Sequence, residues 1–106
     1  MDWSDYQAGV KRTLNPDVKG PEIAVNAALG ITDEGGEVAG AIKKWRYQGH
    51  SLDPEAIVEE LGDVLYYVTL MADWLGYGLD EVAMVNAEKL RDRYGDKFEA
   101  EKSINR

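Results

Sequence analysis

The sequence predicts an all-α protein, most simply a four-helix-bundle-like, single domain over residues 1–106. Apolar residues recur at three- and four-residue steps, as they do on one face of a helix. No stretch alternates apolar and polar side chains with period two for long enough to form a strand. The three prolines, Pro16, Pro21 and Pro54, divide the chain without leaving a long linker. These observations together favour several helices joined by short loops.

Two helices are expected before residue 50. The first runs from Trp3 to Leu14 and stops before Pro16, because proline disfavours helix at the residue that precedes it. The second begins at Pro21, which suits the first turn of a helix, and continues to about Tyr47. Its glycines weaken it, so we expect a kink or break near Gly30 to Asp33.

A third helix is expected from Pro54 to about Leu75, with Asp53 as its N-cap and glycines after it. Its second half, Val64 to Ala72, is apolar on nearly all sides, and such a helix must be buried on most of them. Three other short helices cannot easily cover it. We therefore expect the core to be completed by oligomerisation, as a homodimer or homotetramer.

A fourth helix is expected from an Asp80 cap to about Tyr94. Residues 95–106 are polar and are expected to form a tail or an arm that covers a partner. The apolar positions of this fourth segment are candidates for the core: Leu79, Val82, Ala83, Val85 and Leu90.

Composition excludes several classes of protein. The chain has no cysteine, so disulfide scaffolds, zinc–thiolate sites and thiol nucleophiles are ruled out. Its net charge of −8 argues against DNA or RNA as a polymeric partner, which a basic protein would bind. The start has no signal-peptide pattern, and the longest apolar run is too short to span a membrane. A cytoplasmic protein is the expectation.

Two pairs of carboxylates occupy positions that suit a metal site. Glu34 and Glu37 are three residues apart, as are Glu60 and Asp63, so each pair lies on one face of its helix. Consecutive helices of a bundle usually pack antiparallel, which lets the pairs face each other. Four converging carboxylates repel one another unless cations neutralise them, and Mg²⁺ or Mn²⁺ takes oxygen ligands together with substrate phosphates.

Simpler explanations exist for these residues. One acidic pair on a solvated helix face is common, and only the combination of two pairs on neighbouring helices favours a site. A di-iron carboxylate centre would need Glu-x-x-His pairs, whereas the one histidine, His50, falls in an expected surface loop. Asn86, Lys89 and Arg93 share a helix face that suits a polyphosphate, although spacing alone favours a solvated stripe paired with neighbouring acids.

These residues resemble a known family. The spacing Glu34-x-x-Glu37 followed by Glu60-x-x-Asp63 is similar to the ExxE…ExxD signature of MazG-like nucleoside triphosphate pyrophosphohydrolases, in the all-α NTP pyrophosphatase superfamily. The segments GITDEGGEVAGAIKKW, EELGDVLYYVTLMADWLG and NAEKLRDRYGDKF are similar to family segments in the family's order. The resemblance runs from about Gly30 to Phe98.

The resemblance implies a fold, an activity and a site. The four signature acids would hold Mg²⁺ or Mn²⁺, and water would attack the α-phosphorus of an NTP or dNTP to give a nucleoside monophosphate and pyrophosphate. Where some relatives carry an extra glutamate, this chain has the shorter Asp33. The phosphate-binding candidates are the residues that match the NxxKxxxR stretch, and two chosen by helical phase: Asn86, Lys89 and Arg93, then Lys44 and Tyr67.

Two alternatives stay open at this point. Phosphoribosyl-ATP pyrophosphohydrolase belongs to the same superfamily, although the C-terminal segment looks more like the MazG-like group. A non-catalytic helical module that binds a protein partner is the other, and it predicts acids scattered over the solvent-exposed surface. Base choice would depend on side chains such as Trp3, Tyr6, Gln7 and Trp45, all of which also have ordinary packing explanations.

Overall fold

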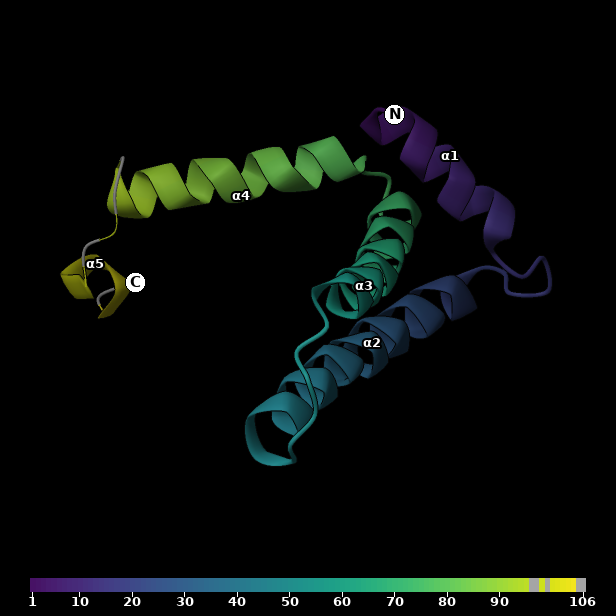
Figure 1. The fold of residues 1–106 in the computed structure, drawn as a ribbon. Helices are drawn as coiled ribbons and strands as arrows, with labels where there is room; N and C mark the ends of the chain where they lie inside the picture. The colour runs from purple at the N-terminus through teal and green to yellow at the C-terminus, as the bar shows by residue number, and fades with distance from the viewer. Residues whose placement is uncertain (96–97, 99, 105–106) are drawn as a thin grey trace.

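Helices joined by loops make up the part of the protein that the computed structural model describes, which comprises residues 1–95, 98 and 100–104. No strand occurs in these residues, so the predicted all-α class is confirmed. The helices shown in Figure 1 are α1 (Trp3–Thr13), α2 (Pro21–Tyr47), α3 (Pro54–Trp74), α4 (Leu79–Tyr94) and α5 (Ala100–Ile104).

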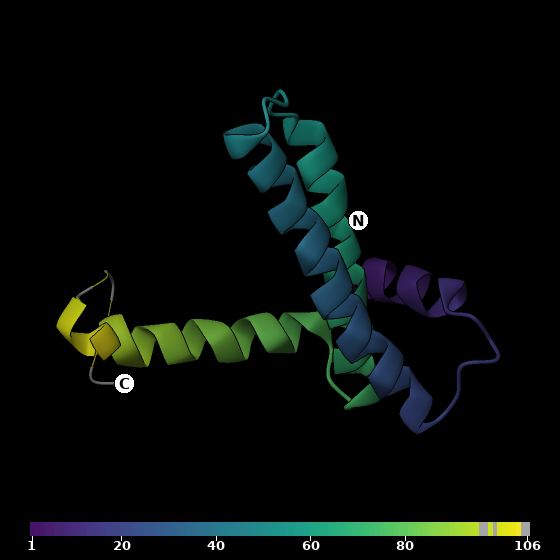
Figure 2. The same ribbon diagram turned by 90° about the horizontal axis from the view of Figure 1, so that it is seen from below.

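The centre of the fold is the pair of helices α2 and α3. They are joined by the short loop 48–53 and lie side by side along most of their length, as Figure 2 shows. Helix α1 packs against α3. Val10, Ala27 and Leu70, one from each of these three helices, form a buried cluster in the core. Partly buried side chains surround them: Tyr6, Leu14, Ile23, Tyr66, Tyr67 and Met71.

Helix α2 is continuous, so the predicted kink or break near Gly30 to Asp33 is wrong. The reason is the close approach of α3 at this point. A Cβ atom on Gly30 would lie 2.4 Å from ring atoms of Tyr67, which is far inside van der Waals contact. Gly30 therefore serves the packing of α2 on α3, and this contact outweighs its low helix propensity of about 1 kcal/mol relative to alanine.

The signals that delimit α3 act as predicted. The side chain of Asp53 accepts a hydrogen bond of 3.2 Å from the backbone N–H of Ala56, and Pro54 is the first residue of the helix. The chain leaves α3 through Gly76, whose φ of 86° is a left-handed conformation that glycine adopts without strain. Local sequence chemistry therefore determines both ends of this helix.

Helix α4 begins differently from the prediction. Its N-cap is Gly78, whose backbone N–H donates a hydrogen bond of 2.9 Å to the Glu81 carboxylate, so the predicted Asp80 cap is wrong. The backbone N–H of Leu79 donates a hydrogen bond to the side-chain oxygen of Gln7. This contact joins the start of α4 to α1, and α4 then extends away from the other helices, as Figures 1 and 2 show.

The extension of α4 leaves its apolar residues uncovered. Leu79 is buried, but Val82, Val85 and Leu90 are 37%, 61% and 45% exposed, and Ala83 is exposed as well. The prediction that these four lie in a core is wrong for the single chain, because α4 makes no contact with α2 in the described structure. The radius of gyration is 16.7 Å, against about 13 Å for a compact domain of this length.

Candidate metal and nucleotide site

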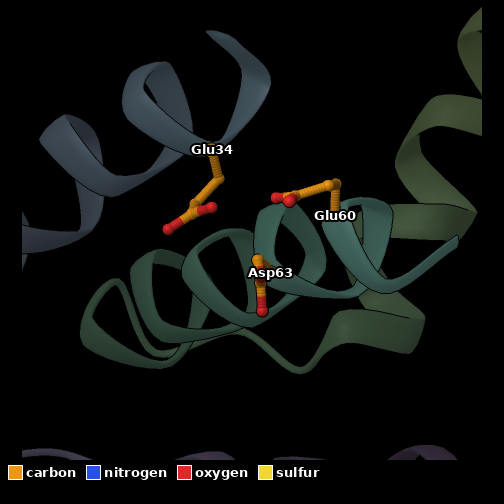
Figure 3. A group of neighbouring side chains, drawn as sticks. All are labelled: Glu34, Glu60 and Asp63. Atoms are coloured by element: carbon orange, nitrogen blue, oxygen red, sulfur yellow. The ribbon is translucent and has the colours of Figure 1, made fainter. Parts of the chain in front are cut away.

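Three carboxylates converge between the two central helices. One oxygen from each of Glu34, Glu60 and Asp63 lies within 4.8 Å of the others. Figure 3 shows Glu34 extending from α2 toward α3, with the side chain of Glu60 directed toward it. The i,i+3 spacing places Glu60 and Asp63 on one face of α3, and the pairing of α2 with α3 brings Glu34 opposite them. We call these three residues the acid triad.

Partial burial, and the repulsion among the negative charges of the triad and its neighbours, raise the pKa of two of its carboxyl groups. Partial burial, and next the charge of Asp63, raise the pKa of Glu34 above its ordinary value. Partial burial, and next the charge of Glu37, raise the pKa of Glu60. The ion pair formed between described residues joins Lys11 to Asp73, so none of the cations in this part of the chain pairs with the triad. Repulsion between these carboxylates is therefore unrelieved.

The other signature acid, Glu37, lies beside the triad rather than within it. Its charge acts on both Glu34 and Glu60, and with Glu60 it lines a cleft at the loop end of the two central helices. Asp33 is exposed, and its charge contributes to the raised pKa of Glu34. The four acids of the two i,i+3 pairs thus lie close enough for their charges to repel one another, and three of them form the acid triad.

Tyr67 lies close enough to these acids for their charges to act on its phenol. Burial, and next the charge of Glu34, raise the pKa of its phenol. Its ring packs edge-on against Tyr66, with 5.1 Å between the ring centroids, and against Gly30. Packing therefore holds Tyr67 in place beside Glu34, on the same side of α3 as the triad.

The remaining sequence candidates are divided between two places. Lys44 lines the same cleft as Glu37 and Glu60. Asn86, Lys89 and Arg93 lie on α4, which leaves the central helices, so a single chain does not bring them to the triad. The cleft also contains His50 and Ser51, which lie in the exposed loop predicted between the two helices. Helical periodicity gave no signal that this loop lines a cleft, because it carries no information about loop residues.

The residues considered for base recognition have different roles. The side-chain oxygen of Gln7 is engaged by the backbone of Leu79. Trp3 and Tyr6 line an apolar cavity of about 430 Å³ together with Leu65. Burial, then the charges of Tyr66 and Asp63, raise the pKa of Tyr6. Trp45 is 41% exposed near the end of α2.

The donor set fits a hard divalent cation. It consists of carboxylate oxygens, the ligands that Mg²⁺ and Mn²⁺ prefer. Their mutual separation of up to 4.8 Å is close to the roughly 4 Å between oxygens on opposite sides of a bound Mg²⁺ ion. A divalent charge would also relieve the repulsion that raises the pKa of Glu34 and Glu60. The acid triad between two helices is therefore a candidate site for a divalent cation.

Comparison with known families identifies the family itself. Residues 25–98, more than half of the chain, match the MazG nucleotide pyrophosphohydrolase domain. The chain therefore belongs to this family, as the sequence motifs suggested, and the family's general activity is nucleotide pyrophosphohydrolysis. Neither the comparison with curated proteins nor that with solved structures gave a match. None of the described helices is long and apolar enough to cross a membrane.

Proposed function

We propose that this protein hydrolyses a nucleoside triphosphate, NTP or dNTP, to the monophosphate and pyrophosphate with Mg²⁺ or Mn²⁺. The observation that carries the proposal is the convergence of Glu34, Glu60 and Asp63, with Glu37 beside them, in a chain of the MazG family. A non-catalytic helical module would have no need of carboxylates that destabilise one another between two helices. The four acids are the proposed metal ligands.

The reaction forms a bond between a water oxygen and the α-phosphorus and breaks the bond from that phosphorus to the bridging oxygen of the β-phosphate. A bound divalent ion would supply positive charge for the phosphoryl oxygens. The carboxylates would hold that ion at the boundary of α2 and α3. The Lys44 ammonium group would donate hydrogen bonds to phosphate oxygens from the neighbouring cleft. The packed ring of Tyr67 would limit the movement of Glu34 beside it.

The test is pyrophosphate release from each of the eight common NTPs and dNTPs, with Mg²⁺ and with EDTA. Release with Mg²⁺ and none with EDTA is the expected result, because an acidic protein needs its metal to accept an anionic substrate. Release of inorganic phosphate instead of pyrophosphate would overturn the assignment of the bond that breaks. If none of the eight nucleotides released pyrophosphate, the result would favour the non-catalytic binding module.

We further propose that the active form is a homo-oligomer, at least a dimer. The chain exposes 7997 Å², whereas a monomer of 11.8 kDa is expected to expose about 5,900 Å². The excess of roughly 2,100 Å² per chain is comparable with a stable interface. Covering α4 with a second copy would bury Val82, Val85 and Leu90, and would allow Asn86, Lys89 and Arg93 to meet a triad on another chain.

Replacement of an apolar α4 residue by a charge is expected to separate the copies. Light scattering coupled to size exclusion should give about twice 11.8 kDa, or more, for the unmodified protein and a lower mass for Val85→Lys. Glu88→Lys, at a polar position of the same helix, is the control and should keep the larger mass. A mass of one chain for the unmodified protein would refute the proposed oligomer.

A further inference from the structure

The cleft at the loop end of α2 and α3 is lined by residues with hydrogen-bond donors as well as by acids. It has a volume of about 240 Å³ and is formed by the last turns of α2, the connecting loop and the first turns of α3. Glu37 and the triad residue Glu60 line the cleft, and so do Lys44, His50 and Ser51, whose side chains carry hydrogen-bond donors. It therefore joins the metal-binding acids to a group of cationic and neutral donors.

The backbone holds these donors in position. The N–H groups of both Gln48 and His50 donate to the carbonyl oxygen of Lys44, at 3.0 and 3.1 Å, so the loop is folded back over the end of α2. Gly49 permits this path with a φ of 73°. The third carboxylate of the cleft, Asp53, already accepts the N–H of Ala56 as the N-cap of α3. Lys44 and His50 are therefore placed by the fold.

Two cavities formed by described residues differ in polarity. One of them is lined largely by Trp3, Tyr6 and Leu65, and offers little to neutralise a phosphate chain. The one that adjoins Glu37 and Glu60 holds Lys44 and His50. Several phosphate charges need cations as partners, so of these two cavities the one at the loop end is the better match for the charged end of a triphosphate.

We propose that the loop-end cleft is the subsite for the two terminal phosphates, with Lys44 and His50 as the residues that position the departing pyrophosphate. The inference rests on the proposed function and adds to it the direction in which the substrate lies. The carboxylates in the same cleft repel a bare polyanion, so pyrophosphate enters as its magnesium complex.

The experiment measures the affinity of inorganic pyrophosphate by titration calorimetry, with and without Mg²⁺, for the unmodified protein and three variants. Lys44→Ala is expected to weaken binding of the magnesium complex by at least about tenfold, and His50→Ala by about threefold or more, since each removes a donor to a charged ligand. Lys43→Ala, which removes the same charge from an exposed neighbour outside the cleft, should change it less than about twofold.

A second ligand separates this role from a general structural effect. The affinity for the nucleoside monophosphate product should stay unchanged in all three variants, because that product lacks the two terminal phosphates. The proposed subsite would be overturned if Lys44→Ala, Lys43→Ala and the unmodified protein bound pyrophosphate with equal affinity. It would also be overturned if Lys44→Ala lost affinity for the monophosphate alone. If the unmodified protein still releases pyrophosphate from a nucleotide in those cases, the proposed function stands and the direction of the substrate is reversed.

Discussion

The Glu60→Gln variant is expected to lose at least about a hundredfold of its metal-dependent hydrolysis and to be more stable than the unmodified protein without metal. Mutation of a residue that only hydrogen-bonds to a metal ligand lowers metal affinity or activity by about 10- to 100-fold. Glu60 is proposed as a ligand itself, so its loss should cost at least as much. The stability rises because the neutral amide removes one of the repelling charges of the triad.

The pH dependence of stability also follows from partial burial and repulsion at Glu60: without metal, the protein should become more stable when Glu60 is protonated. The pKa of Glu60 is raised in the folded protein above the ordinary 4.5, so the folded state binds this proton more tightly than the unfolded state does. Its ionised form therefore destabilises the fold above the raised pKa, and stability is gained as the pH falls through that pKa toward 4.5. Glutamine cannot titrate, so the variant lacks this part of the gain.

Urea denaturation in EDTA at pH 7 and at pH 5 measures both effects beside a pyrophosphate assay. Glu55→Gln is the matched control, because it removes the same charge from an exposed position of the same helix outside the triad. The control should keep its activity. Full turnover by Glu60→Gln would remove this residue from the site, and a lower stability in EDTA would contradict the repulsion.

The Gly30→Ala variant is expected to be less stable by about 1–3 kcal/mol, the usual cost of overpacking. The new Cβ would meet the ring of Tyr67 at 2.4 Å, and that ring is itself packed against Tyr66. Relief requires α2 and α3 to separate where Glu34 faces Asp63, so metal affinity should fall together with stability. The effect is opposite to that expected from helix propensity alone.

Gly36→Ala is the control for this prediction. The position lies in the same helix, and nothing stands within 4 Å of the added Cβ. Here only the propensity acts, and stability should rise by up to about 1 kcal/mol. Urea denaturation of both variants, without metal, makes the comparison. If Gly30→Ala were as stable as Gly36→Ala, the contact with Tyr67 would not be what sets the distance between the helices.

The helices and the triad could be predicted because local rules govern them. Pro21, Asp53 and Pro54 delimit helices through their own backbone chemistry. The i,i+3 spacing places acids on one face, and a short loop makes the two helices neighbours, so Glu34 meets Glu60 and Asp63. No long-range information was needed for either result.

The errors arose where contacts distant in sequence decide the structure. Gly30 looked like a weak point of α2, but its partner, Tyr67, lies on another helix. The start of α4 depends on Gln7 of α1 as well as on Glu81. The direction of α4, and with it the exposure of Val85, follows from no periodicity in the chain. His50 lies in the exposed loop that was predicted for it, but its place in the cleft depends on loop geometry that a helical pattern does not contain.

The central claim is that the acid triad holds a divalent ion, and Mn²⁺ binding followed by electron paramagnetic resonance tests it most directly. The signal of free Mn²⁺ should diminish when the unmodified protein or Glu55→Gln is added. Glu60→Gln should bind at least about tenfold more weakly. If the unmodified protein leaves the free signal undiminished, or if Glu60→Gln binds as tightly as the unmodified protein, the triad is not the metal site.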